Sequence, residues 1–268
     1  MSNNLKSKRH LSVYEKQQLL KYNLSEEEFL KKGEMPVEYF TSWVDFAGLT
    51  LRINKNVLIP RVETEELVNH ALESLKNNQQ KNIKVLDLGT GSGTVALALI
   101  NQLHLLNYLD KKLDFYLIDL SAEAISLAKN NYQKLLLKSL NNDRVKVNFL
   151  KSNLLEKIEN NFQFNLILAN LPYIPSSRVK KLSSSVKDFE PIIALDGGKT
   201  GFELIAKALA QLLDKNLLAK EAILLFETDY SHDYQFLKNY YPSLLKLFEI
   251  NFIKDQFARQ RFLELKIL

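Results

Sequence analysis

The fold is decided by the stretch Val85-Leu86-Asp87-Leu88-Gly89-Thr90-Gly91-Ser92-Gly93. It opens with a short apolar run that is typical of a buried strand, and it continues into a turn with glycine at every second position. A helical pattern then runs over Val95–Gln102. Glycine is favoured in such a turn because a side chain would block the close approach of the backbone to a ligand. The stretch therefore predicts a strand, a ligand-binding loop and a helix.

Downstream of this loop, strands and helices alternate. The predicted strands are Val85–Leu88, Phe115–Ile118, Val145–Leu150, Leu166–Ala169, Ile223–Phe226, Leu245–Phe252 and Phe262–Ile267. The predicted helices after the first are Ala122–Leu140 and Phe202–Leu213. The strands are apolar on both faces, as expected of a parallel sheet covered by helices. The last two strands have no long helix between them, so we expect a doubly wound, mostly parallel α/β sheet of seven strands that ends in an antiparallel hairpin.

Upstream, the pattern is helical and then strand-like. Two capping boxes, in which a hydroxyl caps a helix start and a glutamate three residues later reciprocates, are Ser12 with Glu15 and Ser25 with Glu28. A β-hairpin is predicted from about Phe40 to Val57 around Gly48, and Thr64 is predicted to cap the following helix. The predicted organisation is a short helical N-terminal domain at 1–35, a linking β-hairpin at 36–60 and the main domain at 61–268.

Composition excludes several classes of protein. The chain has 268 residues, of which 46% are hydrophobic, and its charged residues are mixed along the sequence. It has no run of about 18 apolar residues and no apolar stretch near its N-terminus, so we expect a cytoplasmic protein without membrane span or signal peptide. There are no cysteines, and His10, His70, His104 and His232 lack ligand spacing, so no metal site is predicted. The net charge of +5 decides nothing alone.

The glycine spacing narrows the choice of ligand. A dinucleotide loop has the spacing G-x-G-x-x-G, and Thr94 stands where its third glycine would be. The spacing Gly89-x-Gly91-x-Gly93 resembles motif I of the class I methyltransferases. This resemblance implies S-adenosyl-L-methionine as cofactor, bound by Gly89, Thr90, Gly91, Ser92 and Gly93. Asp119 ends the next strand, where its carboxylate could accept both ribose hydroxyls or could instead only cap the following helix.

The third strand is followed by Asn153 and Leu154. Class I methyltransferases often have an acidic residue at the position of Asn153, facing the adenine amino group. The amide oxygen of Asn153 can also accept a hydrogen bond from that group, and Leu154 can pack on the adenine face. Both residues are therefore predicted to bind the cofactor.

The fourth strand runs into Asn170-Leu171-Pro172-Tyr173. An amide or arylamine nitrogen is a poor nucleophile, because its lone pair is delocalised, so an enzyme must hold it in position. Asn170 offers an acceptor oxygen for one N–H, the Leu171 carbonyl can accept the other, Pro172 stiffens the turn, and Tyr173 can lie flat on the planar group. The loop resembles the Asn/Asp-Pro-Pro-Tyr loops of methyltransferases that act on adenine amino groups and glutamine amides, with Leu171 in place of the first proline. These four residues are the predicted catalytic and substrate-binding residues, and Asn170 is also predicted to touch the cofactor.

Further stretches resemble one family, the bacterial release-factor glutamine methyltransferases. They are Pro36–Tyr39, Ile59–Glu65, Glu190–Gly198 and, in the tail, Asp255 with Arg261. The resemblance implies that the methyl acceptor is the glutamine of the Gly-Gly-Gln loop of a peptide-chain release factor. We also expect a monomer and no direct nucleic acid substrate.

Three alternatives stay open. The first is an amino-methyltransferase acting on adenine or guanine in nucleic acid, although no target-recognition domain or dense basic groove is apparent. The second is a non-catalytic cofactor-binding partner protein, and the third, disfavoured by the glycine spacing, is a dehydrogenase. The basic residues Arg178, Lys180 and Lys181 are predicted to form a solvated rim or a contact to the substrate protein.

Overall fold

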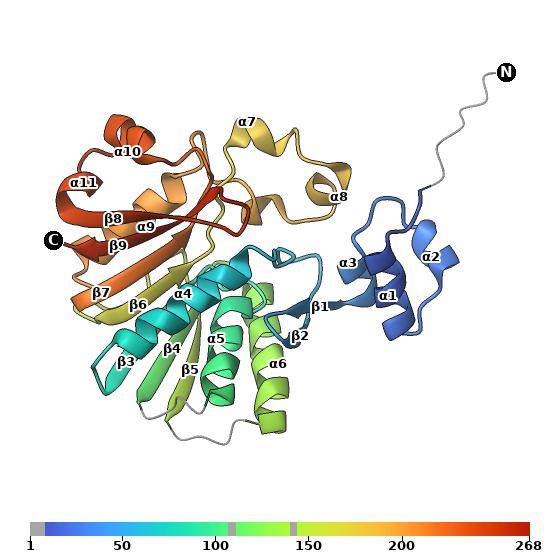
Figure 1. Ribbon diagram of the computed structural model, residues 1–268, viewed down its shortest axis with the longest axis horizontal. Helices are drawn as coiled ribbons and strands as arrows, with labels where there is room; N and C mark the ends of the chain where they lie inside the picture. The colour runs from blue at the N-terminus through green and yellow to red at the C-terminus, as the bar shows by residue number, and fades with distance from the viewer. Residues whose placement is uncertain (1–8, 107–110, 140–143) are drawn as a thin grey trace.

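The computed structural model describes residues 9–106, 111–139 and 144–268 (Figure 1). Within these residues the main body is a seven-stranded sheet with helices on both faces. Its strands are β3 (Asn82–Leu88), β4 (Lys112–Asp119), β5 (Val145–Lys151), β6 (Phe164–Ala169), β7 (Leu218–Glu227), β8 (Phe248–Lys254) and β9 (Gln260–Ile267). In space they follow the order β5-β4-β3-β6-β7-β9-β8.

The sheet is parallel from β5 to β7, and β9 runs antiparallel to both β7 and β8. The predicted mostly parallel, seven-stranded sheet with a C-terminal antiparallel hairpin is therefore confirmed. The strand order reverses at β3, because the chain passes to β4 and β5 on one side and then to β6 on the other. In open α/β sheets, ligands bind beyond the carboxyl ends of the strands at such a reversal.

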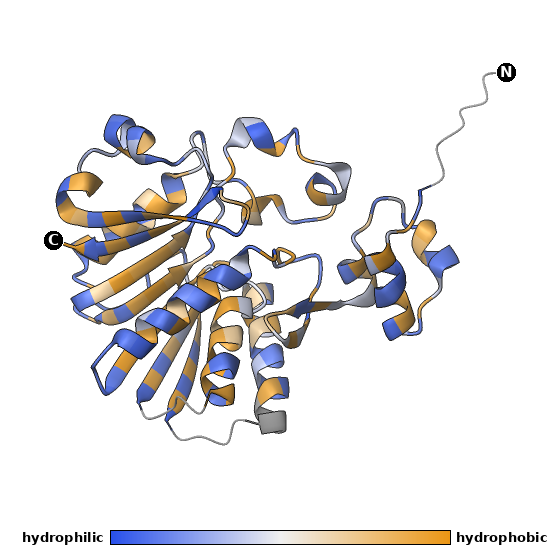
Figure 2. Ribbon diagram, viewed as in Figure 1, coloured by the Kyte–Doolittle hydropathy of each residue, from blue (hydrophilic) through white to orange (hydrophobic). Residues whose placement is uncertain are grey.

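Apolar clusters cover both faces of the sheet. Val85 packs in one cluster with α4 (Thr64–Asn77), α5 (Thr94–Leu105) and α6 (Ala122–Ser139), whereas the next residue, Leu86, packs in the other with α9 (Glu203–Asp214). Both side chains are completely buried. In Figure 2 the central strands β6 and β7 are hydrophobic along much of their length, while α4 alternates between hydrophilic and hydrophobic residues. This pattern agrees with strands that are covered on both faces.

The first part of the chain forms a separate small cluster beside the main body (Figure 1). Its elements are α1 (Val13–Lys21), α2 (Glu26–Leu30) and α3 (Val37–Thr41), which pack around Leu19, Phe29 and Val37. The first capping box is confirmed, since Ser12 Oγ accepts from the Glu15 N–H and the Ser12 N–H donates to Glu15 Oε2.

The expected hairpin is confirmed as β1 (Trp43–Phe46) and β2 (Leu49–Arg52), and it joins the helical cluster to the main body. Gly48 lies in its turn with a φ of +79°, a conformation that side chains other than glycine rarely adopt. One side of the hairpin packs into the larger apolar cluster through Val44, Phe46, Leu49 and Leu51. The linking hairpin is therefore packed against the sheet domain.

Three local predictions are wrong. The Ser25 hydroxyl accepts the Glu28 N–H, but the Glu28 side chain does not accept the Ser25 N–H, so the second capping box is only half formed. Thr64 is the first residue of α4 and not its cap, because Glu63 holds the capping position and the Thr64 hydroxyl is used elsewhere. The strand predicted from Leu245 begins at Phe248, because Leu244–Leu247 forms the short helix α11. The remaining short elements were not predicted: α7 (Ser176–Val179), α8 (Ser184–Lys187), a 3₁₀ turn η1 (Ile192–Ala194) and α10 (Tyr234–Tyr240).

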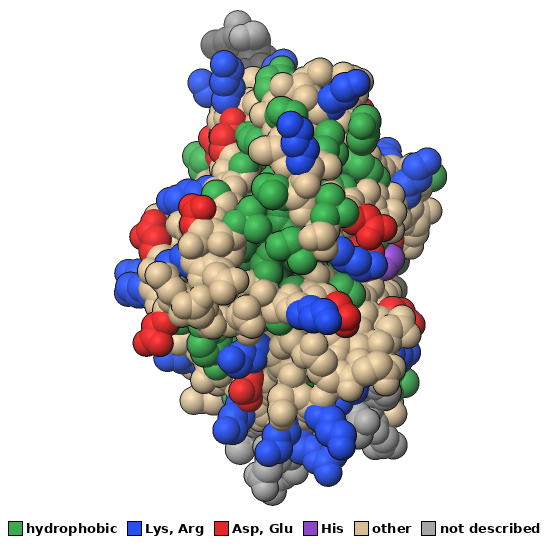
Figure 3. Space-filling model, turned by 90° about the vertical axis from the view of Figure 1, so that its left-hand side faces the viewer, with side chains coloured by type: hydrophobic (Ala, Val, Ile, Leu, Met, Phe, Trp, Pro, Cys, Tyr) green, Lys and Arg blue, Asp and Glu red, His purple; other side chains and the backbone are tan. Residues whose placement is uncertain are grey.

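The C-terminal hairpin forms one edge of the sheet, with β8 outermost. On the face of the molecule that carries this edge, hydrophobic side chains gather near the middle, with charged side chains of both signs around them (Figure 3). The Leu268 N–H donates to the Leu247 carbonyl, which ties the chain end to α11. In the described ranges, no helix has the length and apolar character needed to cross a membrane.

Candidate active site

A cleft of about 680 Å³ opens at the carboxyl ends of β3, β4, β5 and β6. It brings together most of the residues predicted from the sequence: Gly89, Thr90, Gly91, Ser92, Asp119, Asn153, Leu154, Asn170, Leu171 and Pro172. Gly93 and Tyr173 do not line this cleft. Residues from four separate strand ends thus meet at the reversal of the strand order, where ligand binding is expected.

The glycine loop is shaped for close approach. Gly91 has a φ of +55°, and no atom lies within 4 Å of the place that a Cβ would take, so its backbone faces open space in the cleft. Gly89 has a φ of +76°, and a Cβ there would lie 3.0 Å from the side chain of Leu171. The loop therefore needs glycine both for its conformation and for its contact with the loop after β6.

Asp87 holds the glycine loop in place through hydrogen bonds. Its buried carboxylate accepts the Thr90 hydroxyl at 2.6 Å and the Ala96 N–H at 3.3 Å, so it ties the loop to the start of α5. Burial raises the pKa of Asp87 to about 6, although the two hydrogen bonds act in the opposite direction. The ionised carboxylate is therefore held at a cost in stability at neutral pH.

This cost predicts a dependence of stability on pH. The pKa of Asp87 in the folded chain, about 6, lies above the ordinary value of 3.8. The stabilising effect of its protonation is therefore complete below 3.8 and is lost as the pH rises through 6. Relative to the Asp87→Asn variant, the wild type should gain roughly 2 kcal/mol of unfolding free energy between about pH 8 and about pH 4.5. Urea unfolding of both proteins at the two pH values measures this difference, and a constant difference would contradict it.

Asp119 links the glycine loop to the next strand end. Its Oδ2 accepts the Gly91 N–H at 2.9 Å, and its Oδ1 accepts the Ser121 N–H at 2.9 Å. Burial raises the pKa of Asp119, and these backbone bonds counteract it. The hydroxyl of Ser121 accepts from the Ala124 N–H and so caps α6. Asp119 also lines the cleft, and each carboxylate oxygen has a further lone pair with which to accept a hydrogen bond there.

Asn153 and Leu154 form the wall at the end of β5. The Asn153 amide nitrogen donates to Glu156 Oε1 at 2.5 Å, which leaves its amide oxygen as the group available to a ligand. Leu154 is buried and has a φ of +49°, an unusual conformation for leucine that places it at the cleft. The arrangement is compatible with both predicted contacts.

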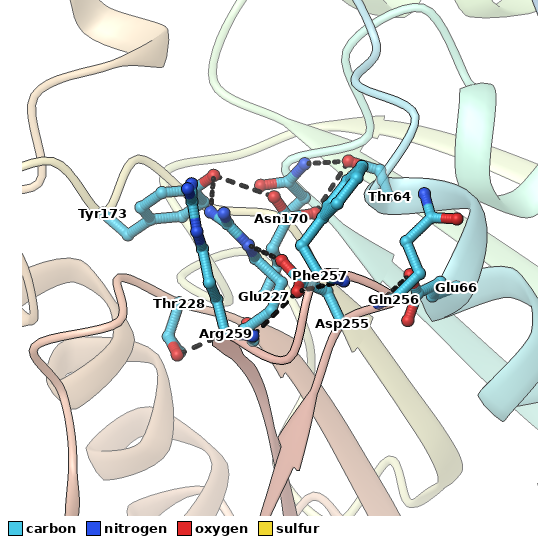
Figure 4. Close-up of polar contacts among 11 residues, drawn as sticks. Thr64, Glu66, Asn170, Tyr173, Glu227, Thr228, Asp255, Gln256, Phe257 and Arg259 are labelled. Atoms are coloured by element: carbon cyan, nitrogen blue, oxygen red, sulfur yellow. Dashed lines mark hydrogen bonds and ion pairs between the residues drawn. The ribbon is translucent and has the colours of Figure 1, made fainter.

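Asn170 and Tyr173 belong to one partly buried hydrogen-bond network (Figure 4). The Asn170 Nδ2 donates to Thr64 Oγ1 at 3.1 Å, and the Thr64 hydroxyl donates to Glu227 Oε2 at 2.7 Å. The Tyr173 hydroxyl donates to the other carboxylate oxygen, Glu227 Oε1, at 2.8 Å. Burial, with the adjacent Glu227 carboxylate, raises the pKa of Tyr173 well above its ordinary value. The predicted stacking of Tyr173 on the acceptor stays a prediction.

The tail of the chain reaches this network. Arg261 on β9 donates from Nη1 to the Tyr173 hydroxyl at 3.5 Å and from Nε to Asp255 Oδ2 at 3.4 Å. Asp255 also accepts the backbone N–H groups of Phe257 and Arg259, which shapes the turn between β8 and β9 (Figure 4). Of the two tail residues that resemble the family, Arg261 therefore contacts Tyr173 in the loop after β6, and Asp255 holds Arg261.

Two of the other stretches that resemble the family, Ile59–Glu65 and Glu190–Gly198, contact each other beside the cleft. Arg61 Nη2 pairs with Glu190 Oε1 at 2.6 Å, and the Ile59 N–H donates to Glu190 Oε2 at 3.2 Å. Burial raises the pKa of Glu190, whereas the Arg61 charge lowers it. A Cβ at Gly197 would lie only 2.5 Å from the Pro172 carbonyl oxygen. These contacts hold both stretches against the loop after β6.

The basic residues after that loop divide between two environments. Arg178 forms an ion pair with Asp229, with Nη2 and Oδ2 2.5 Å apart, and its guanidinium lies over the Tyr230 ring. Lys180 and Lys181 are exposed. Arg178 therefore has an internal partner, and only the two lysines match the predicted solvated rim.

Sequence reasoning missed Thr64 and Glu227 as members of the site. Glu227 follows the apolar run of β7 and pairs in register next to the end of β6, since Ala169 lies opposite Phe226. A carboxylate at the carboxyl end of a parallel strand was therefore a signal that could have indicated it. Thr64 gave no comparable signal, because its expected capping role explained its residue type.

Comparisons with known proteins show the family of the chain. A family model described as a methyltransferase domain matches residues 79–227. The release factor glutamine methyltransferase of Clostridium botulinum is 34% identical over 210 residues, which cover 77% of this chain and 67% of the relative. That of Clostridium acetobutylicum is 36% identical over 199 residues, 74% of this chain and 64% of the relative. The chain thus spans slightly less than two thirds of the latter.

Solved structures share the fold at low sequence identity. The hMettl16 catalytic domain, solved with an RNA hairpin, superposes with a TM-score of 0.57 at 16% identity, over 82% of this chain and 74% of that chain. The Thermus thermophilus 16S rRNA methyltransferase RsmC, solved with AdoMet and guanosine, gives 0.53 at 13% identity, over 84% and 50%. At these identities they bear on the fold alone. From the sequence matches and the family model, the chain belongs to the release factor glutamine methyltransferases and carries a methyltransferase domain.

Proposed function

We propose that this protein transfers the methyl group of S-adenosyl-L-methionine to the side-chain amide nitrogen of the glutamine in the Gly-Gly-Gln motif of a peptide-chain release factor. The observation that carries the proposal is the position of Asn170. It lies in the same cleft as the glycine loop, with its amide nitrogen directed to the Thr64 hydroxyl. Its amide oxygen is thereby available to an N–H donor.

The residues of the cleft fit the cofactor. Gly91 leaves open space for a ligand backbone or carboxylate, and Asp119 presents a carboxylate suited to ribose hydroxyls. Leu154 and the Asn153 amide oxygen provide an apolar surface and an acceptor suited to an adenine ring and its amino group. When bound, S-adenosyl-L-methionine would supply an electrophilic methyl group to the amide nitrogen, with the thioether S-adenosyl-L-homocysteine as the second product and the displaced amide proton passing to solvent.

The chain contributes mainly by positioning the acceptor. Asn170 Oδ1 accepts one N–H of the glutamine amide, and the Leu171 carbonyl accepts the second, so that the nitrogen is aimed along the cleft. In the described part of the chain, no residue donates a hydrogen bond to Asn170 Oδ1. Such fixed placement accounts for about 7–11 kcal/mol of barrier in favourable cases, which suits a poor nucleophile.

The binding energy for the protein substrate comes from outside the cleft. We assign the helical N-terminal domain (1–35) and the linking hairpin (36–60) to recognition of the release factor, and residues 61–268 to catalysis. Remote contacts of this kind are absent for free glutamine, so free glutamine should react poorly. The two glycines beside the acceptor remove side-chain bulk and let the backbone approach the loop after β6.

A substrate panel tests the proposal. The protein is incubated with S-adenosyl-L-methionine labelled in its methyl group and with a release factor, free glutamine or DNA at equal concentration. We expect label in the release factor only, and none when its Gly-Gly-Gln glutamine is replaced by asparagine, which draws the amide back by one methylene. Methylation of DNA at a rate equal to that of the release factor would favour the nucleic acid alternative instead.

A further inference from the structure

Glu227 occupies an unusual place at the end of β7. Its side chain is almost completely buried, with a relative exposure of 1%, and each carboxylate oxygen accepts one hydroxyl. Oε2 accepts from Thr64 at the start of α4, and Oε1 accepts from Tyr173 in the loop after β6 (Figure 4). A buried carboxylate is costly unless it is paired, so a carboxylate at this position needs a reason beyond packing.

The direction of each hydrogen bond can be deduced from donor counts. Arg261 can only donate, so the Tyr173 hydroxyl, which accepts from it, directs its own hydrogen to Glu227. Thr64 likewise has one hydroxyl hydrogen, and the ionised Glu227 can only accept it. Thr64 Oγ1 can therefore face Asn170 only as an acceptor, so the group of Asn170 that meets it is the amide NH₂. The orientation of the Asn170 amide therefore follows from the hydrogen-bond donors and acceptors around it.

We propose that Glu227 and Thr64 are positioning residues that set which side of the Asn170 amide faces the methyl acceptor. The proposal rests on the proposed function, because it concerns an acceptor that brings N–H groups. With the NH₂ of Asn170 held by Thr64, the amide oxygen is the group presented to the acceptor. A reversed amide would place N–H groups against the N–H groups of the acceptor, and the nitrogen would not be held.

On balance burial raises the pKa of Glu227, but three groups around it partly offset this effect and favour the carboxylate. Burial raises the pKa of Glu227, and Glu63 adds to this, whereas the hydrogen bonds from Thr64 and Tyr173 and the charge of Arg261 lower it. Three separate elements therefore supply the groups that favour the carboxylate: α4, the loop after β6, and β9. Their convergence on one buried side chain distinguishes this carboxylate from a surface ion pair.

The Glu227→Gln variant keeps the shape of the side chain but reverses the direction of the hydrogen bonds that run from residue 227 through Thr64 to Asn170. The amide oxygen of the introduced glutamine still accepts from Tyr173, so its NH₂ faces Thr64, and Thr64 then turns its hydrogen to Asn170. The Asn170 amide must now present its oxygen to Thr64. We expect kcat to fall by about 10²-fold or more, as when one preorganised polar group is lost, with cofactor affinity within about threefold of the wild type.

Thr64 provides a second, independent pair of variants. Thr64→Val keeps the shape but removes the hydroxyl, which frees the amide to turn, and should lower kcat by about tenfold. Thr64→Ser keeps the hydroxyl and should retain kcat within about threefold. A purely structural role of the Thr64 methyl group predicts the opposite order, since serine and not valine loses that methyl. This pair decides the question even if Glu227→Gln fails to fold.

Glu65→Gln is the matched control, because Glu65 neighbours Thr64 but its carboxylate accepts the Ala47 N–H on the hairpin. It should leave kcat unchanged. For each variant, kcat and KM for the release factor are measured beside cofactor affinity by calorimetry and the melting temperature. An inactive wild type would refute the proposed function itself. If the wild type is active, full kcat in Glu227→Gln would contradict the positioning role of Glu227 and Thr64. Equal loss of kcat in Thr64→Ser and Thr64→Val would contradict it as well.

Discussion

The Asn170→Ala variant should bind S-adenosyl-L-methionine with nearly normal affinity and yet lose about 10²–10³-fold in kcat. Asn170 lies where β6 ends, and its amide is tied to Thr64, so its free oxygen is placed for the acceptor and not for the bulk of the cofactor. Alanine removes the acceptor of one N–H of the substrate amide, and the nitrogen is then no longer aimed. Calorimetry with the cofactor and single-turnover transfer to a release factor measure the two quantities separately.

Asn165→Ala is the control for this variant. Asn165 lies on the same strand at the opposite end, where its side-chain oxygen accepts the Lys84 N–H at 2.8 Å, so it shares the strand but not the cleft. Its kcat should equal that of the wild type. A collapse of cofactor affinity in Asn170→Ala, with normal turnover of the remaining bound complex, would show that Asn170 serves the cofactor and not the acceptor.

The Asp119→Ala variant should weaken S-adenosyl-L-methionine binding by roughly ten- to a hundredfold. This loss corresponds to one charge-assisted hydrogen bond to a ribose hydroxyl, which contributes about 1.5–3 kcal/mol. The variant also loses the carboxylate that accepts the Gly91 N–H, so the glycine loop loses a fixed contact to β4. Calorimetric titration of the folded variant measures the change.

Asp114→Ala is the matched control on the same strand. Asp114 lies near the amino end of β4, away from the cleft that Asp119 lines. Cofactor affinity should be unchanged in this variant. If Asp119→Ala also binds the cofactor with wild-type affinity while remaining folded, Asp119 has no part in the cofactor site.

The sheet was predictable because its information is local. Each strand of the parallel core is a short apolar run, and the glycine loop marks the first crossover, so Val85–Gly93 identified both the fold and the cleft. Errors arose where tertiary packing decides the conformation. The apolar run from Leu245 suited a strand as well as a helix, and the chain uses it as α11 before β8 starts.

The residues proposed to bind the cofactor and the acceptor could be predicted from the sequence, but the residues that orient them could not. Asn170 and Asp119 stand at strand ends, and a position at the carboxyl edge of a parallel sheet can be deduced from sequence. Thr64 and Glu227 are separated by 163 positions in the chain, and only the folded structure brings their side chains together. Hydrogen-bond polarity between such distant residues has no local sequence pattern.

The most direct test of the central claim is tandem mass spectrometry of a release factor after incubation with this protein and S-adenosyl-L-methionine. We expect one added methyl group on the glutamine of the Gly-Gly-Gln motif, located on the side-chain amide, in the wild-type reaction but not in the Asn170→Ala reaction. Methylation at any other residue, or an unmodified release factor in the presence of a folded, cofactor-binding protein, would contradict it.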